Sequence, residues 1–468
     1  MGNSSFKYQV QQVEENKYIL PAKEDIKVDI HAFLSEELYQ ASEENMWSQA
    51  VNAANYEGVQ SVYLMPDCHS GFGVPIGSVV VTDNTIIQSS VGYDISCGII
   101  MARVNGLTAT DLTRRSRESW ITEVEKRVAL GIGCNRPKLM PEFKKATIEN
   151  VLRYGAKAIG INADVCERQF IPVSDTAKVD LVTKAFEKAM PQFGSLGGGN
   201  HFIELQVDQD GSVWVMAHCG SRGFGYQTAE YFFYEGAKQR NLASNRRELS
   251  WLRYDEPLGK QYWDHHNMAA NYATANRQII MRSLSEAFQK VYNTDLEVYY
   301  DISHNLVQQE TVISNGVAKK CFVHRKGATR AMPSNHPNLI GTKWIDTGHP
   351  CLIPGSMTEG AAILIPQSNA YNSACSVNHG AGRVMARGEA KRKLEHKQEE
   401  IDSEMHDMVR QFRGVDVGGI ITNTKHVPLD ECNKVYKDLD TVLNVLLNNG
   451  IATISHRLYP VAVLKGTD

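Results

Sequence analysis

Apolar residues gather in short runs that glycine and polar turn residues separate along most of the chain. Runs rich in β-branched and aromatic residues predict strands at residues 61–67, 77–83, 85–91, 98–104, 213–218 and 297–303. Between two of these runs stands Asp83-Asn84, which we expect to form a tight hairpin turn.

Three other segments carry apolar residues at every third or fourth position, which predicts helices in 113–130, 226–293 and 383–412. The Lys, Arg and Glu runs of the last segment indicate a solvated helical face, with an RNA-binding arm as the lesser alternative. Strands and helices do not alternate as in βαβ units. The pattern therefore predicts an α+β fold: one compact catalytic domain over 1–468, with helical insertions at about 226–293 and 383–412.

Composition narrows the class of protein. The 468 residues carry a formal net charge of −4, so binding of nucleic acid would need a local basic surface. The nine cysteines include no CxxC pair, which indicates reduced thiols and no disulfide framework. The sequence contains no apolar run of the roughly 18 residues that a spanning helix needs. We therefore expect a soluble cytoplasmic protein without membrane association.

Five potential metal ligands stand where strand-like runs break into turns. They are His201 in GSLGGGNHFIEL, His218 in VWVMAHCGSRGFG, His304 in VYYDISHN, and Asp94 and Cys97 in VGYDISCG. Any one of them alone is more typical of a capping or core residue. Together, one thiolate, three imidazoles and one carboxylate on similar corners predict a clustered metal site, and the residues themselves leave zinc open.

Glycine-rich turns with polar neighbours indicate phosphate binding. Asn200 follows three glycines and Glu204 comes three residues after His201, although a flexible strand entry explains the glycines equally well. HCGSRG is a candidate anion-binding turn. The segment 323–333 gathers four cationic or potentially cationic side chains, which favours phosphate contacts over a solvated basic loop: His324, Arg325, Lys326 and Arg330.

The segment SVNHGAGRVMARGEAKR predicts a nucleophile beside an anion site. Arg383 and Arg387 would share one face of a helix that begins near Arg383, and His379 would face the same N-terminus. Such a histidine is placed to attack phosphorus, whereas the alternative is a histidine N-cap. Ser356, in a Pro-Gly turn, is a weaker candidate for contact with a base or ribose. The chain has neither GxxxxGK[ST] nor KxDG, so nucleotidyl transfer would need His379.

These segments together resemble the RtcB family of RNA ligases, the tRNA-splicing ligases. The matching stretches run in the family's order from about Leu64 to Gly466: MPDCHSGFGVPIG, VGYDISCG, GSLGGGNHFIE, HCGSRG, ISHN, VHRKGATRA, LIPGSM, HGAGRVMAR and VAVLKG. The resemblance implies a distinctive α+β fold and two Mn²⁺ ions. By motif match one ion would be held by Asp94, Cys97 and His201, and the other by Cys97, His218 and His304.

The resemblance also implies a reaction. His379 would attack the α-phosphorus of GTP to form a histidine–GMP adduct, and GMP would move to an RNA 3′-phosphate, generated where necessary from a 2′,3′-cyclic phosphate. A 5′-hydroxyl end would then displace GMP. Asn200, Glu204, Ser356 and Lys465 match positions near the guanine nucleotide, and Asp67 matches an acidic residue of later steps. RNA and GTP are the implied substrates, and the sequence leaves open whether the reaction needs an activating partner such as archease.

The chain departs from the family pattern at several positions. Cys219 and Tyr226 stand where a threonine and a histidine are expected, Asn378 replaces a cysteine, and 358–360 is Thr-Glu-Gly where small residues are typical. These departures leave tRNA splicing and RNA repair both open. One alternative is a dinuclear metal-dependent RNA cyclic phosphodiesterase without ligation. Another is a non-catalytic RNA-binding protein, which would be expected to lack the nucleophile or the ligands.

Overall fold

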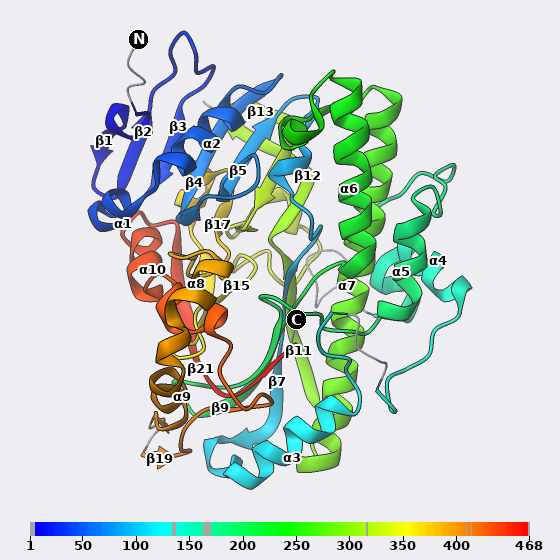
Figure 1. The fold of residues 1–468 in the computed structure, drawn as a ribbon, viewed down its shortest axis with the longest axis vertical. Coiled ribbons are helices and arrows are strands. Elements are labelled where there is room, and N and C mark those ends of the chain that lie inside the picture. The colour runs from blue at the N-terminus through cyan, green and yellow to red at the C-terminus, as the bar shows by residue number, and fades with distance from the viewer. Residues whose placement is uncertain are drawn as a thin grey trace.

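The computed structural model describes residues 5–132, 137–161, 170–314, 317–408, 410–412 and 414–466. A seven-stranded sheet occupies the upper part of the molecule in Figure 1. Its strands, in spatial order, are β1 (Gln11–Glu14), β2 (Lys17–Leu20), β3 (Ile30–Phe33), β4 (Val59–His69), β5 (Ile76–Thr82), β13 (Val317–Lys326) and β12 (Asn305–Ser314). All neighbours are antiparallel except β3 and β4.

A second, eight-stranded sheet carries the C-terminal strand in its interior. Its order is β11 (Leu296–Ser303), β7 (Gly98–Thr108), β9 (Ser212–Cys219), β8 (Phe202–Asp208), β21 (Ala452–Lys465), β16 (Ala361–Pro366) and β15 (Cys351–Pro354), and β20 (Ile421–Thr422) pairs with β21. The chain passes from β11 into β12 through His304. This single residue therefore connects the two large sheets.

Three two-stranded pairings complete the β structure of the described residues. They join β6 (Thr85–Ile86) with β10 (Leu252–Arg253), β14 (Ala328–Arg330) with β17 (Ser376–Asn378), and β18 (Gln411–Phe412) with β19 (Val415–Asp416).

Helices cover the sheets and form a layer of their own. The bounds are α1 (Glu36–Ala41), α2 (Glu44–Ala54), α3 (Arg114–Glu125), α4 (Lys145–Tyr154), α5 (Thr183–Gln192), α6 (Arg222–Gln239), α7 (Pro257–Tyr292), α8 (Arg387–Leu394), α9 (Gln398–His406) and α10 (Leu439–Asn448). Helices α2 and α10 pack on β4, and α3 packs on α7. In Figure 1, α6 and α7 run alongside one another, and α4 and α5 lie outside them.

Helix α7 is the main support of the second sheet. It begins with Pro257 in its first turn, where a missing N–H is tolerated, and ends at Tyr292, followed by the C-cap Asn293, whose φ of 54° is left-handed. Its buried positions include many alanines and other small residues, so the helix contacts β7, β9 and β11 closely. This helix of 36 residues thereby packs across β7, β9 and β11, three neighbouring strands of the second sheet.

The α+β prediction is confirmed, and five of the six predicted strand runs coincide with β4, β5, β7, β9 and β11, although the run 77–83 extends one residue beyond β5. The run 85–91 is mostly wrong, because only Thr85–Ile86 is a strand and Gln88–Ser90 is a 3₁₀ helix. The hairpin at Asp83-Asn84 is also wrong. The chain turns there, but β5 pairs with β4 and β13, whereas β6 pairs with β10.

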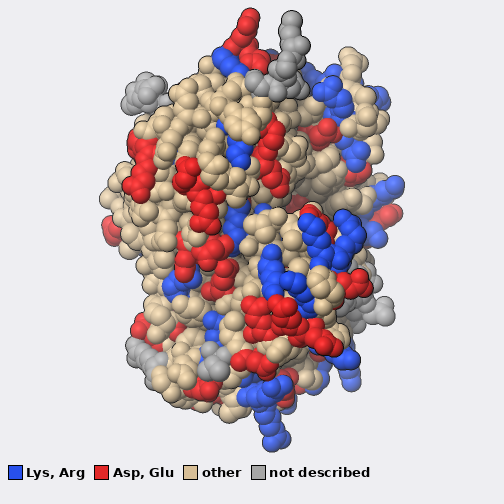
Figure 2. All heavy atoms as spheres, turned by 60° about the vertical axis from the view of Figure 1, so that its left-hand side comes forward, with Lys and Arg blue, Asp and Glu red and all other residues tan. Residues whose placement is uncertain are grey.

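The predicted helices are real but shorter. The segment 113–130 contains α3, and 226–293 overlaps α6 and contains α7. The predicted long helix over 383–412 is wrong: it is divided into α8, a 3₁₀ turn and α9. Lys393 and Glu389 form an ion pair of 2.6 Å there, and Lys434 pairs with Glu400. Figure 2, which brings this side forward, shows Lys and Arg mixed with Asp and Glu, as expected of a solvated face.

Within the described residues, we find no helix that combines the length and apolar character required to span a bilayer. The cysteines that the structure describes are all buried and carry free thiols: Cys68, Cys97, Cys219, Cys321, Cys351, Cys375 and Cys432. This agrees with the prediction of reduced thiols for these seven residues.

Candidate metal centre and adjoining pocket

The strand-to-loop corners that carry the predicted ligands meet at one edge of the eight-stranded sheet. Gly98, where β7 begins, pairs with Cys219 at the end of β9 and with Ser303 at the end of β11. Phe202, where β8 begins, pairs with His218. The register of four strands therefore brings together segments that are far apart in the sequence.

All five predicted metal ligands come into contact at this edge. Asp94 Oδ2 lies 2.9 Å and Cys97 Sγ 3.4 Å from His201 Nε2. Cys97 Sγ also lies 3.1 Å from His218 Nε2, which is 3.2 Å from His304 Nε2. The residues form two groups of three donors, each within 4.8 Å, and the thiol belongs to both. This geometry suits two neighbouring ions that share one sulfur ligand.

Backbone carbonyls orient two of the imidazoles. His218 Nδ1 lies 3.1 Å from the carbonyl oxygen of Asn200, and His201 Nδ1 lies 2.9 Å from that of Leu196. A proton on each Nδ1 satisfies the carbonyl and leaves the Nε2 lone pair directed into the cluster. Hydrogen bonding of the second ring nitrogen is the usual means of fixing a metal-binding histidine.

The electrostatics of the cluster favour a cation. Burial, reinforced by the Asp94 carboxylate, raises the pKa of the Cys97 thiol to about 12. Burial also holds the pKa of His218 and of His304 well below the ordinary value for histidine. Neutral imidazoles are ready ligands, and a bound divalent ion would supply the charge that stabilises the thiolate. The donor set fits a borderline ion such as Zn²⁺ or Mn²⁺.

The turn after β9 holds Asp94 in place. Ser221 donates to Asp94 Oδ1 through its backbone N–H at 3.1 Å and through its hydroxyl at 3.4 Å. In HCGSRG, the predicted anion-binding turn, the N–H and hydroxyl of Ser221 therefore bind the carboxylate of Asp94. On the other side, Ser96 adopts a φ of 59° and its N–H donates to the carbonyl of Asn305 at 2.6 Å.

A cavity of about 250 Å³ adjoins the cluster. It brings together seven residues that the sequence associated with nucleotide or phosphate: Asn200, Glu204, Ser356, His379, Arg383, Arg387 and Lys465. Its wall also contains three residues that the sequence reasoning missed: Phe202, Glu431 and Tyr436. Because His218 lines the cavity as well, the pocket opens directly onto the metal cluster.

His379 lies at the boundary between the pocket and the cluster. Its Nδ1 is 2.6 Å from Asp67 Oδ2, and its backbone N–H donates to the same oxygen at 3.1 Å. Its ring centroid lies 5.0 Å from that of His304. A side chain at Gly382, which has a φ of 77°, would clash with the backbone of Asp67. Asp67 therefore holds the histidine by Nδ1 and leaves Nε2 available for chemistry.

The arginine pair is close to the pocket, but not in the predicted way. Helix α8 begins only at Arg387, and Arg383 lies in a β-bridge with Tyr436, so the shared helical face is wrong. Both guanidiniums instead reach Glu431, at 3.3 Å and 2.5 Å. The bridge to Tyr436 keeps the backbone at Arg383 extended. A contact between residues so far apart in the sequence leaves no trace in the local periodicity.

Glu431 collects four donors in the pocket wall. Besides the two arginines, Lys465 Nζ lies 2.9 Å and the Tyr436 hydroxyl 2.8 Å from its Oε2. Burial opposes ionisation, but the charges of Lys465 and Arg387 hold the pKa of this carboxyl below its usual value. The sequence offers one indirect sign of Glu431. Arg383, Arg387 and Lys465, if gathered in one pocket, would need an acidic side chain nearby to balance their charge.

Two other polar groups shape the pocket. Burial raises the pKa of Glu204 to about 7, although Gln206 Nε2 donates to its Oε2 at 2.7 Å. The Ser356 hydroxyl donates to Glu359 Oε2 at 3.0 Å. Glu359 belongs to the Thr-Glu-Gly segment at residues 358–360.

The predicted phosphate contacts of the segment 323–333 are wrong. His324, Arg325, Lys326 and Arg330 are all buried. Arg325 forms a two-pronged ion pair with Glu310 at 2.7 and 2.9 Å. Lys326 donates to the carbonyls of Phe72 and Val74, and burial lowers its pKa to about 7. Arg325 and Lys326 join segments of the first sheet and the loop before β5, and their polar atoms are used within the chain.

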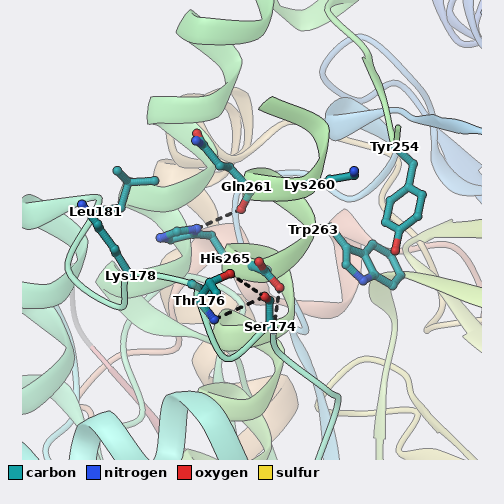
Figure 3. A pocket seen from close by; sticks show the side chains of 11 residues that line it. Ser174, Thr176, Lys178, Leu181, Tyr254, Lys260, Gln261, Trp263 and His265 are labelled. Atoms are coloured by element: carbon teal, nitrogen blue, oxygen red, sulfur yellow. Dashed lines mark hydrogen bonds between the residues drawn. The ribbon is translucent and has the colours of Figure 1, made fainter. Parts of the chain in front are cut away.

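A larger cavity, of about 540 Å³, lies elsewhere, between the first turns of α7 and the loop near Ser174. Figure 3 shows Trp263 and Tyr254 on one side, with Lys178 and Lys260 well apart. The Ser174 and Thr176 hydroxyls bond to one another at 2.9 Å. None of the five clustered ligands lines this cavity, so its volume alone does not make it the functional site.

Comparison with known proteins places the chain in a family. The family model described as tRNA-splicing ligase RtcB matches residues 49–466. A tRNA-splicing ligase RtcB of Methanococcus maripaludis is 32% identical, over 98% of this chain and 99% of the relative. An RNA-splicing ligase RtcB of Mycobacterium bovis is 33% identical, over 89% of this chain and 100% of the relative. Matches of this extent show that the chain belongs to the tRNA-splicing ligase RtcB family.

Proposed function

We propose that this chain is an RNA ligase that uses GTP and Mn²⁺ to join RNA 3′-phosphate or 2′,3′-cyclic-phosphate ends to 5′-hydroxyl ends through a histidine–GMP intermediate. Family membership and the names of the relatives support ligation of RNA. The observation that carries the mechanism is the position of His379, bound by Asp67 at 2.6 Å between the metal cluster and the pocket.

His379 supplies the nucleophile. With the Nδ1 proton directed to Asp67 Oδ2, the Nε2 lone pair attacks the α-phosphorus of GTP, and pyrophosphate leaves with the electrons of the broken P–O bond. The ring then carries a positive charge, which the neighbouring carboxylate stabilises as in other carboxylate–histidine pairs. Asp67 is therefore a positioning residue for the first step.

The two ions would be held by Asp94, Cys97 and His201 and by Cys97, His218 and His304, and would neutralise charge on the phosphoryl groups. The pocket contributes further positive charge. Lys465, Arg383 and Arg387 surround Glu431 and are the Lys and Arg side chains that line the pocket in which a nucleotide would lie beside His379.

We assign the base-binding part of the pocket to Glu204, Ser356 and Lys465, all of which line it. After guanylylation of the histidine, GMP passes to an RNA 3′-phosphate, which breaks the P–N bond and regenerates His379. A 5′-hydroxyl then attacks the activated phosphate, and GMP leaves. Hydrolysis of a cyclic phosphate alone would require neither a histidine nucleophile nor a nucleotide pocket, so ligation explains more of the site.

Incubation with α-³²P-labelled GTP and Mn²⁺ tests the proposal. We expect a protein-bound label that is lost in acid and retained in base, as a P–N bond requires. ATP should label poorly, because its adenine lacks the donors and the acceptor of guanine. His379→Asn should abolish labelling, whereas His426→Asn, on an exposed side chain, should not. Equal labelling by both nucleotides, or labelling of the His379 variant, would refute this function.

A further inference from the structure

A stack of aromatic rings stands beside the metal cluster and takes no part in the reaction described above. Tyr226, in the first turns of α6, stacks on Tyr93 with ring centroids 5.0 Å apart and planes inclined by 23°. Tyr93 packs in turn against Phe72 at 5.4 Å and Phe233 at 5.1 Å. Tyr226 is nevertheless 49% exposed, so a rigidly supported ring faces solvent.

The position of these rings is fixed by the segments that form the active site. Tyr93 immediately precedes the ligand Asp94, and a Cβ on Gly225 would lie 3.5 Å from the N–H nitrogen of Ile95. Phe72 lies three residues after His69, which lines the pocket beside His379. The stack therefore lies at the rim of the metal centre, where α6 meets the Asp94 turn.

The chemistry of the exposed face matches a nucleobase. Every base has a flat π-face, and stacking on an aromatic side chain contributes without regard to base identity. Because Tyr93 already covers one face of Tyr226, the ring loses little freedom when a base covers the other. Arg247 Nη2 lies 3.5 Å from the Tyr93 hydroxyl and 3.6 Å from Glu230 Oε1, so this ion pair holds the edge of the stack in place.

We propose that Tyr226 is the stacking platform for a nucleobase of an RNA end that enters the metal centre, within the first nucleotides of the junction. The proposal rests on the proposed RNA ligase function and adds a substrate-binding residue to it. The tyrosine offers a flat ring that is half exposed and is held on its other side by Tyr93.

The test uses RNA that carries 2-aminopurine, whose fluorescence falls when the base stacks. One RNA bears it at the terminal nucleotide of a 3′-phosphate end, and another at the first nucleotide of a 5′-hydroxyl end. Both are titrated with full-length protein and Mn²⁺ in the absence of GTP. Tyr226→Ala, Tyr226→Phe and Tyr226→Trp are compared with Tyr154→Ala, because Tyr154 is equally exposed, at 49%, but lies on α4.

We expect quenching with one or both RNAs, which also identifies the end that binds. Tyr226→Ala should abolish it and weaken RNA binding about tenfold, within the range measured for base stacking on aromatic residues. The Phe and Trp variants should remain close to wild type, as should Tyr154→Ala. All variants should retain the wild-type melting temperature and the rate of protein guanylylation.

Unchanged binding and quenching in Tyr226→Ala would overturn the proposal. So would an equal loss in Tyr154→Ala, or a fall in melting temperature that accounts for the lost binding. If wild-type protein forms no GMP adduct, the proposed mechanism fails, but the titrations without GTP still decide whether Tyr226 stacks on RNA. The two proposals can therefore fail separately.

Discussion

Arg277 and Asp301 form a buried ion pair directly behind the metal cluster, with 2.7 Å between Nε and Oδ1. The same guanidinium donates to the carbonyl of Ser96 at 2.6 Å and to that of Cys219 at 3.1 Å. One side chain of α7 thus joins the Cys97 turn, the end of β9 and the end of β11. The ligands are held by this bond network as well as by strand pairing.

Arg277→Ala should therefore affect both stability and metal binding. It removes the counter-charge of the buried Asp301 carboxylate, a loss that typically costs about 3–5 kcal/mol, and it frees the three corners that carry ligands. We expect a lower urea midpoint and a loss of bound metal, measured by mass spectrometry of the purified protein. Arg282→Ala, at an exposed position of the same helix, is the control. Full metal content in Arg277→Ala would contradict this role.

Variants of Cys97 and His379 should separate metal binding from nucleophilic attack. Cys97→Ala removes the donor common to both groups, so we expect it to lose tightly bound metal and all ligation. His379→Ala should keep its metal but form no GMP adduct. Supplied with RNA that is already guanylylated, the His379 variant should still join the ends, whereas the Cys97 variant should not. Retention of full metal content by Cys97→Ala would show that the assignment is wrong.

Glu204 should make stability depend on pH. Burial raises its pKa from 4.5 to about 7 in the folded protein, so the folded state keeps a proton that the unfolded state loses. Its contribution is fully present below about pH 4.5 and is lost as the pH rises to about 7. From pH 5 to pH 8, Glu204→Gln should gain up to about 3 kcal/mol relative to wild type.

Urea unfolding of both proteins at the two pH values measures this difference. Glu297→Gln, at an exposed strand position, should show no such gain. A gain of the Glu204 variant that is the same at pH 5 and pH 8 would show that the carboxyl does not titrate in this range.

Arg325 should act in folding and not in RNA binding. Its ion pair with Glu310 is buried, and Arg325→Ala removes the counter-charge of that carboxylate, at a cost of about 3–5 kcal/mol. We expect a large fall in the free energy of unfolding. In the fraction that remains folded, the salt dependence of RNA binding should be unchanged. A shallower dependence of RNA affinity on salt in this variant would mean that Arg325 contacts phosphate after all.

Arg387→Ala should weaken use of the nucleotide. The side chain is 35% exposed at the pocket, and its loss removes one charge-assisted contact, worth about 1.5–3 kcal/mol. We expect a lower adduct yield at limiting GTP and recovery at high GTP. Lys393→Ala, in the same helix and 63% exposed, should behave as wild type. An unchanged yield at limiting GTP would place this arginine outside the nucleotide site.

Much of the site was predictable because its parts are local. A ligand such as His218 or Cys97 stands beside the turn that ends its strand, and both features can be read within a few residues. The order of motifs along the chain was sufficient to indicate the family. The α+β class followed from strand runs and helical periodicity that do not alternate.

Only the tertiary structure revealed the counter-charges. Arg325 pairs with Glu310 on the adjacent strand and not with phosphate, and Arg383 and Arg387 pair with Glu431, more than forty residues away. The first residue of α8 could not be predicted either, because a β-bridge to the distant Tyr436 keeps Arg383 extended and α8 begins only at Arg387. The sequence by itself determined which ligand types stand at which turns. Whether a charge faces solvent, a ligand or a buried partner depends on contacts between distant segments, for which the chain has no local pattern.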